Sequence, residues 1–196
     1  MTAISQPARI ADHPVHPQFL GRWSPRAFDG TPMTPADMLT LLEAARWAPS
    51  ASNNQPWRFV WGLRGDAGFD AIAGALVPGN HVWAHKAAGL VVVASKTTTT
   101  ANEVTKPNAL HAFDTGAAWV QLALQAHLGG FFAHAMAGFD GPALASAIAL
   151  PADHAIHAVV AIGRQGDPAT LPEALRLRET PSGRLPLAET THRGSF

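Results

Sequence analysis

The first run of regularly spaced apolar residues predicts a helix that begins after Thr34. Thr34 is a good N-cap, Pro35 suits the first helical position, and Asp37 can complete a capping box. Pro49 sets the end of the helix. The apolar stripe of this helix consists of Met38, Leu41, Leu42 and Ala45.

A longer apolar periodicity predicts a helix from about Asn108 to Leu128, ended by Gly129 and Gly130. Its many alanines and Trp119 predict burial on most sides. Shorter helices are expected at residues 66–76 and 142–149. One side of the long helix carries Leu110, Phe113, Ala117, Val120 and Leu124.

Continuous apolar stretches between these helices predict strands at residues 57–61, 89–95, 131–136 and 155–163. The threonine run 97–100 is expected to be a surface loop. Residues 1–16 are expected to form an irregular arm, and residues 164–196 an extended arm with one short helix at 172–179. Strands separated by helices predict a central mixed or mainly antiparallel sheet flanked by helices, an α+β fold, in a single domain over residues 1–196.

Composition narrows the classes of function. The 196 residues have zero formal net charge, with only 14% charged residues, so the basic excess of a nucleic-acid-binding protein is missing. Cysteine is absent, which leaves neither disulfides nor thiolate chemistry. No signal-peptide pattern or membrane-length apolar run is present. We therefore expect a cytoplasmic protein without nucleic-acid or membrane partners, and the scarcity of charge beside six tryptophans hints at an oligomer.

Two polar segments are candidates for chemistry. In GRWSPRAF (Gly21–Phe28), Arg22, Ser24 and Arg26 alternate along a stretch interrupted by proline, which places them on one side as a possible anion site. In APSASNNQPW (Ala48–Trp57), hydroxyl and amide groups crowd between a helix and a strand, and they suit the edge of a flat heterocycle. Taken singly, the first segment could equally be a solvated surface strand and the second an ordinary turn.

Other chemistries have weaker support. His81 and His85 have the spacing that places two rings on one helix face, but no third metal ligand is evident. The glycine-rich stretch 62–68 lacks the order of a dinucleotide-binding fingerprint. No nucleophile-elbow motif of a serine hydrolase is present.

Taken together, the two polar segments resemble the N-terminal motifs of the nitroreductase family, with a capped helix between them. The stretch HAFDTGAAWVQLALQAHLGG is similar to the central helix of that family, AMAGFD to its glycine-containing segment, and SGRLPLAE to its C-terminal Arg-x-Pro motif. The resemblance extends from Arg22 to Glu189. It implies an FMN-binding homodimer with the cofactor in a cleft between the subunits.

The resemblance assigns roles to the arginine segment. Arg22 and Ser24 match positions that hold the FMN phosphate, with Trp23 between them in the cofactor-binding set. Arg26 matches a basic position beside the pyrimidine edge of the flavin ring. A fixed cation there would stabilise the negative charge that reduction adds to the ring.

Further cofactor contacts are implied by the other motifs. Asn53 matches an amide that bonds the pyrimidine side of the flavin, and Ser50 and Gln55 belong to the same loop. Gly138 matches a glycine whose N–H approaches flavin N5, where a side chain would block close contact. Arg184 matches a second phosphate-binding arginine, and Met136, beside the glycine segment, completes the cofactor-binding set.

The chain departs from many relatives at two positions. Ala137 replaces a glutamate before the glycine, so protons must come from another source. Ser182 replaces a lysine two residues before the C-terminal arginine, which leaves more of the phosphate to Arg22.

The activity implied is electron transfer from NAD(P)H through FMN to a small organic acceptor, by a ping-pong mechanism. No catalytic acid or base and no metal ligand is assigned. Two alternatives remain open: a non-catalytic FMN storage or sensor protein, and a specialised branch such as a dehalogenase, a dehydrogenase or a flavin-fragmenting enzyme.

Overall fold

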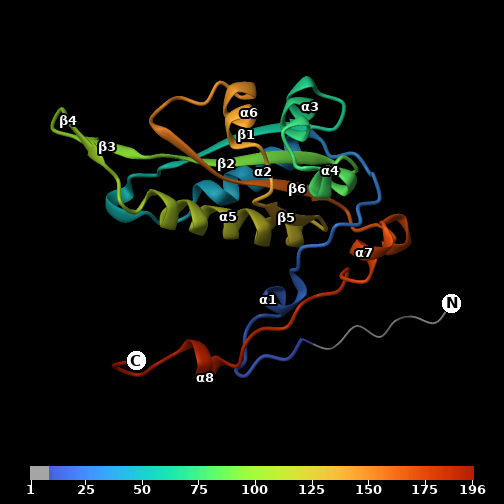
Figure 1. The fold of residues 1–196 in the computed structure, drawn as a ribbon. Helices are drawn as coiled ribbons and strands as arrows, with labels where there is room; N and C mark the ends of the chain where they lie inside the picture. The colour runs from blue at the N-terminus through green and yellow to red at the C-terminus, as the bar shows by residue number, and fades with distance from the viewer. Residues whose placement is uncertain (1–8) are drawn as a thin grey trace.

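The computed structural model describes residues 9–196, and its centre is a four-stranded sheet (Figure 1). The strands are β1 (Trp57–Leu63), β2 (Gly89–Lys96), β6 (His154–Gly163) and β5 (Phe132–Met136), in the spatial order β1-β2-β6-β5. Every neighbouring pair is antiparallel. The sheet is thus antiparallel and not mixed, in agreement with the α+β expectation.

Helices cover both faces of the sheet (Figure 1). On one face lie α2 (Pro35–Arg46) and α5 (His111–Leu128), which pack against each other. The opposite face carries α3 (Ala67–Gly74), α4 (Pro78–Ala84) and α6 (Gly141–Ala147). The sequence pattern gave no indication of α4. No helix among residues 9–196 has both the length and the apolar character needed to cross a membrane.

Successive side chains of the central strands point to opposite faces of the sheet, which divides the core into two halves. On β2, Val91 and Val93 belong to the cluster under α2 and α5. Leu90 and Val92 belong to the cluster under α3, α4 and α6. Because both faces of β2 are covered, this strand is a continuous apolar run, as its sequence indicates.

The predicted start of α2 is confirmed in detail. The Thr34 hydroxyl accepts the N–H of Asp37 at 3.1 Å, and the Asp37 carboxylate accepts the N–H of Thr34 at 2.9 Å. These two bonds satisfy backbone donors that the first helical turn leaves unpaired. Pro35 occupies the first helical position, where its missing N–H costs nothing.

The expectation that α5 is buried on most sides is wrong for the single chain. Ala118, Leu122 and Ala126 face the core with no exposed surface. Phe113 is 78% exposed and Val120 is 50% exposed, and both belong to the apolar side that the sequence pattern identified. The helix therefore presents an apolar face to the outside.

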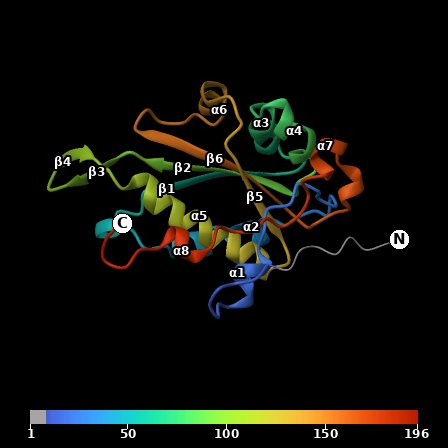
Figure 2. The same ribbon diagram turned by 60° about the horizontal axis from the view of Figure 1, so that its bottom comes forward.

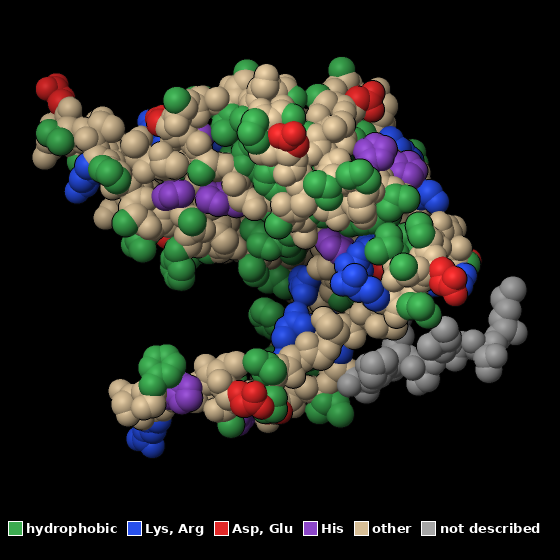
Figure 3. Space-filling model, in the orientation of Figure 1, with side chains coloured by type: hydrophobic (Ala, Val, Ile, Leu, Met, Phe, Trp, Pro, Cys, Tyr) green, Lys and Arg blue, Asp and Glu red, His purple; other side chains and the backbone are tan. Residues whose placement is uncertain are grey.

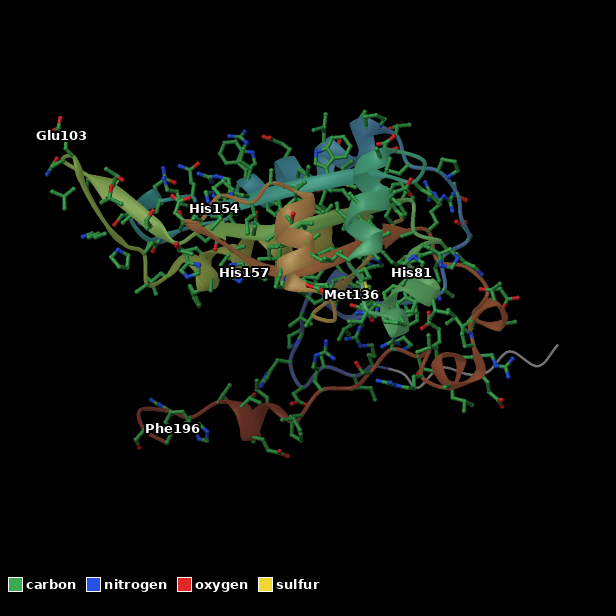
Figure 4. All side chains as sticks on the ribbon, turned by 45° about the horizontal axis from the view of Figure 1, so that its top comes forward. His81, Glu103, Met136, His154, His157 and Phe196 are labelled. Carbon is green, nitrogen blue, oxygen red and sulfur yellow. The ribbon has the colours of Figure 1, made fainter. Side chains whose placement is uncertain are left out.

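The threonine run forms a hairpin, so its assignment as a loop is also wrong. Strand β3 (Thr98–Ala101) pairs with β4 (Val104–Pro107), and the hydroxyls of Thr100 and Thr105 bond across the pair at 2.9 Å. The hairpin projects beyond the end of the main sheet, with Glu103 at its tip (Figure 4). Threonine is β-branched and favours extended backbone, which accounts for strands in a polar stretch.

Two arms lie on the side of the molecule that carries α5 (Figures 1 and 2). The N-terminal arm includes the short helix α1 (Pro17–Gly21), and its first eight residues lie outside the described part of the chain. The C-terminal arm includes α7 (Glu173–Arg176), which confirms the expected short helix, and α8 (Leu187–Thr190). The arms meet where the N–H of Leu187 donates to the carboxylate of Asp12 at 2.9 Å.

Candidate functional site: an arginine pocket and a strained loop

A polar pocket of about 410 Å³ lies where the two arms meet the end of the sheet. Lys and Arg side chains gather in the hollow between the body and the arms (Figure 3). Five of the ten lining residues are arginines, and none of the ten is acidic. The lining consists of Arg9, Arg22, Trp23, Ser24, Arg26, His134, Arg178, Thr180, Ser182 and Arg184.

The segment 22–27 presents its polar side chains to this pocket by simple alternation. Trp23 and Ala27 are buried, whereas Arg22, Ser24 and Arg26 are only half-buried and line the cavity. This confirms that the three polar residues share one side. The guanidinium of Arg22 donates to the hydroxyl of Ser24 at 3.4 Å, so the pair forms one donor cluster.

Burial of the guanidinium groups, together with repulsion between them, is the main electrostatic feature of the pocket. Burial lowers the pKa of Arg22, and the charges of Arg9 and Arg184 lower it further. Burial and the charge of Arg184 likewise lower the pKa of Arg9. These cations face one another across the cavity with no acid in its described lining, so a bound anion would relieve the repulsion.

Backbone contacts hold the arginines in place. The guanidinium of Arg9 donates to the carbonyls of Leu20 and Arg22 at 2.7 and 2.8 Å, which fixes the segment that enters the pocket. Arg184 donates to the carbonyl of Gly183 at 2.8 Å on the exposed C-terminal arm. Neither Arg9 nor Arg178 was predicted as a site residue, because neither lies in a family motif.

His134 on β5 forms one wall of the pocket. Its Nδ1 lies 2.9 Å from the carbonyl of Pro25, and a carbonyl can only accept, so Nδ1 carries the proton. Burial lowers the pKa of His134 to about 4, and the charge of Arg26 adds to this, while the bond to Pro25 opposes it. The ring packs on Trp83 with centroids 4.7 Å apart. His134 is therefore a neutral wall in a cationic pocket, and the sequence gave no signal for it.

The loop that carries Ser50, Asn53 and Gln55 is built from strained backbone. Ser52, Asn53 and Gln55 have φ values of 51°, 53° and 46°, a region that costs about 1 kcal/mol or more for residues with a Cβ. The Ser50 hydroxyl accepts the N–H of Gln55 at 3.0 Å and closes the loop. Asn53 is exposed, so its side-chain amide is available to a ligand.

The Ser50–Gln55 loop is tied to the start of α5. The buried carboxylate of Asp114, in the first turn of that helix, accepts the N–H of Ala51 at 3.2 Å. The hydroxyl of Thr99 in the hairpin donates to the side-chain carbonyl of Asn54 at 2.8 Å. Both contacts fix the loop from outside its own sequence.

The loop and the arginine pocket lie at opposite ends of α5. Gln18, in α1 beside the pocket segment, donates to the carbonyl of Leu124 at 2.9 Å near the end of the helix. Asp114 and Leu124 are ten residues apart, which is about 15 Å along a helix axis. Within one chain, eight of the ten residues predicted to hold one cofactor therefore form two groups: Arg22, Trp23, Ser24, Arg26 and Arg184 in the pocket, and Ser50, Asn53 and Gln55 in the loop.

Gly138 and Met136 are not in the lining of the pocket. A Cβ at Gly138 would lie 2.7 Å from the amide nitrogen of Asn80 and 2.9 Å from a methyl group of Val77, so the close approach seen here is to the α4 region. Asn80 also donates to the carbonyl of Gly138 at 2.9 Å. The side chain of Met136 is 3% exposed and packs in the core under α3, α4 and α6.

The histidines do not gather into a metal-binding group in the described chain. No cluster of three or more histidine or acidic side chains suited to a metal occurs among residues 9–196. His81 and His85 stack on each other with ring centroids 5.8 Å apart. The Nδ1 atom of His85 is engaged with the carbonyl of His81 at 2.9 Å.

Comparisons with known proteins agree with this architecture. Residues 20–77 match the family model described as Nitroreductase family. An uncharacterized 15.4 kDa protein of Mycolicibacterium smegmatis is 37% identical over 148 residues, which cover 71% of this chain and 97% of that protein.

Solved structures extend the likeness to the whole chain. A crystal structure described as an oxidoreductase containing FMN is 46% identical, with a TM-score of 0.94 and 96% of each chain covered. A protein from Desulfovibrio desulfuricans solved in complex with FMN is 25% identical, with a TM-score of 0.73, 95% of this chain and 99% of that chain covered. A nitroreductase family protein from Streptococcus pneumoniae, 19% identical, shares the fold with a TM-score of 0.71, 90% of this chain and 98% of that chain covered.

The family match begins two residues before Arg22 and includes both the arginine segment and the Ser50–Gln55 loop. The structural likeness adds the antiparallel sheet, the central helix and the arms that enclose the pocket. By its motifs, its fold and its relatives, this chain belongs to the nitroreductase family.

Proposed function

We propose that this protein is an FMN-dependent oxidoreductase that passes electrons from NAD(P)H to a small organic acceptor, such as a nitroaromatic compound or a quinone. The observation that carries the proposal is the arginine pocket, in which neighbouring cations face one another without an acid in the described lining. Relatives that contain FMN or were solved with it support that cofactor as the anion.

The residues present fit a phosphate monoester. Arg22 and Ser24 already share a hydrogen bond, and Arg184 approaches from the other arm, so their donors surround one small volume. Burial and mutual repulsion lower the pKa of Arg22, and a phosphate of charge about −2 would offset both. A single donor cluster of this kind suits FMN, which has one phosphate, better than FAD, which has two.

The protein's own contribution is binding, orientation and charge. When bound, FMN supplies hydride-transfer chemistry that no protein side chain offers. The guanidinium of Arg26 would stabilise the negative charge that reduction adds at the pyrimidine edge. Ala137 offers no carboxyl group beside Gly138, so protons must come from solvent or from the bound substrate.

A homodimer would join the two groups of site residues. The Ser50–Gln55 loop of one chain would lie against the arginine pocket of the other, which a single chain cannot achieve across the length of α5. The exposed apolar face of α5, with Phe113 and Val120, offers a surface for a second chain. An open hollow of about 760 Å³ between the arms offers another surface for a second chain, and it shares Arg9 and Arg184 with the pocket.

The test begins with the purified protein. It should be yellow and should release FMN, not FAD, on denaturation, and it should consume NAD(P)H when a quinone or nitroaromatic compound is added. Donor and acceptor should use one pocket in turn, which gives parallel double-reciprocal lines. Protein that binds no flavin would overturn the proposal. Protein that binds FMN without consuming NAD(P)H would indicate a storage role, and intersecting lines would show separate binding sites.

A further inference from the structure

Glu179 is a buried carboxylate in the C-terminal arm, just beyond α7, and only 4% of its surface is exposed. Its Oε1 atom accepts the N–H groups of Arg26 and Ala27 at 2.6 and 2.8 Å. Its Oε2 atom is buried and has no hydrogen-bond partner. A buried carboxylate with unmet acceptors is costly unless a cation lies close by.

That cation is Arg26, whose Nη1 atom lies 3.8 Å from the unpaired Oε2 atom of Glu179. Among the ion pairs of the described chain, this is the only one that involves an arginine of the pocket. The other titratable groups near Arg26 are Arg178, whose charge repels it, and His134, whose imidazole is neutral. Glu179 thus compensates one guanidinium and leaves the other pocket cations uncompensated.

Arg26 contacts both the pocket and the buried carboxylate of Glu179. Its side chain lines the pocket together with Arg22 and Ser24, yet its backbone and its guanidinium are both held by Glu179 from behind. Burial lowers the pKa of Arg26, and the carboxylate counters that effect. A carboxylate in this place both fixes where the guanidinium sits and reduces the positive potential that it projects into the pocket.

We propose that Glu179 is a positioning residue that holds Arg26 and limits its effective charge, and thereby sets the reduction potential of the flavin bound in the arginine pocket. This inference rests on the proposed function. It assigns a task to a residue that matches no family motif in the sequence and that lies 153 positions from its partner.

Glu179→Gln removes the negative charge of the side chain and keeps its size and shape, so it tests the charge alone. The amide oxygen can still accept the two backbone N–H groups, so the local fold is retained, while Arg26 loses its counter-ion. Reduced FMN, which is anionic, should then gain affinity relative to oxidised FMN by on the order of tenfold. Because relative affinity and potential are linked, the midpoint potential should rise. Arg26→Ala should change the potential in the opposite direction.

The experiment measures two quantities for purified protein loaded with FMN: the dissociation constant of oxidised FMN and the midpoint potential of the bound cofactor. The matched control is Glu173→Gln, the same charge change on the exposed surface of α7, which should leave both quantities as in the native protein. A raised potential in Glu179→Gln alone supports the proposal. An unchanged potential in folded Glu179→Gln protein would show that Glu179 is purely structural and would overturn it.

A second set of variants tests whether the effect passes through Arg26. In an Arg26→Gln background, Glu179→Gln should change the potential by less than a third of its effect in the native background. A full effect there would mean that the carboxylate acts directly on the flavin, which contradicts the proposal. If Glu179→Gln does not fold, Glu179→Asp, which keeps the charge but withdraws it from Arg26, should raise the potential by a smaller amount, and no rise would contradict it.

Failure of the proposed function gives a different result. Native protein that binds no FMN would refute the function and with it this role of Glu179. Native protein that binds FMN, with the same potential in Glu179→Gln, refutes only the role of Glu179.

Discussion

The arginine pocket and the Ser50–Gln55 loop are built in opposite ways. Half of the pocket lining consists of arginines from segments that are far apart in sequence, and these cations repel one another. The loop consists of six consecutive residues, and its shape is held by a hydroxyl within it, by backbone in the left-handed region and by contacts with Asp114 and Thr99. A bound anion would therefore complete the pocket, whereas the loop is already in its final shape.

This difference separates two physical sources of binding. The pocket stores unfavourable charge repulsion, which a phosphate would release as binding energy. The loop stores backbone strain, which the folded protein has already offset and which a ligand leaves unchanged. Ligand affinity and stability that depend on the pocket should thus change with pH, salt and charge substitutions. The contribution of the loop to stability should change with substitutions that alter backbone freedom.

The largest expected effect is a loss of stability at low pH, and it arises from His134 in the wall of the pocket. The folded pKa of His134 is about 4, below the usual 6.5, so the unfolded chain binds a proton more readily than the folded protein. Stability should therefore fall as the pH drops below about 6.5, with the loss complete near pH 4 and on the order of 3 kcal/mol. Denaturant titrations at pH 7 and pH 4.5 measure it, and His134→Gln should remove this part of the loss.

The control for His134 is His13→Gln, which changes an exposed histidine of the N-terminal arm. It should leave the pH dependence of the native protein unchanged. Equal acid sensitivity in native protein and in His134→Gln would show that the imidazole is not held neutral against the pocket cations.

The next largest effect is a loss of FMN affinity when a positive charge is removed from the pocket. Arg184→Ala should weaken FMN binding by roughly 10- to 100-fold, because a charge-assisted hydrogen bond contributes about 1.5–3 kcal/mol. Arg193→Ala, an exposed arginine of the same arm, is the matched control and should bind FMN normally. Fluorescence titration with FMN measures both. An unchanged dissociation constant for Arg184→Ala would place the phosphate elsewhere.

Mixing two variants sharpens the comparison further, because the two regions would come from different chains. Arg184→Ala and Asn53→Ala should each weaken every site of a homodimer. In a mixed dimer, one site would carry both substitutions and the other neither, so about half of the high-affinity sites should return in the mixed dimers. Titration of isolated mixed dimers that shows no recovery would mean that one chain supplies the whole site.

The smallest effect concerns the loop. Ser52 has a φ of 51° and an exposed side chain, so Ser52→Gly should remove backbone strain and raise the free energy of unfolding by roughly 0.5–1 kcal/mol. Ser146→Gly in α6 is the matched control, and it should lower stability by a similar amount because glycine is a poor helix former. Denaturant midpoints of the two variants should move in opposite directions. Loss of stability in Ser52→Gly would show that the loop is not strained.

Features that depend on near neighbours in the chain were predictable. The capping box at Thr34 and Asp37 lies within one helical turn, and the alternation of Arg22, Ser24 and Arg26 follows from extended backbone. The hairpin at 98–107 was missed because its threonines are polar, and a polar stretch without apolar alternation gives no strand pattern. The same absence of pattern hid α1, α4 and α8.

The candidate site was predictable only in part. Its motifs identified Arg22, Arg26 and Arg184, but nothing local marked Glu179 or His134 as their neighbours. Glu179 is an ordinary charged residue in a charged segment, and it becomes buried only because the C-terminal arm returns to the start of the chain. Likewise, the exposed side of α5 carries the apolar residues expected of an interior face, because periodicity cannot tell burial within one chain from a surface between chains.

The sequence by itself determined the elements of the sheet and its two main helices, the family, and the residues that suit a phosphate and a flat heterocycle. Local propensity, capping and motif order are properties of short segments, so they can be read without a fold. Only the tertiary structure decided that the arginines gather without a compensating acid in their lining, that a buried carboxylate holds one of them, and that the loop and the pocket lie at opposite ends of α5. These depend on contacts between residues 63 to 153 positions apart, which chain packing sets and no local pattern encodes.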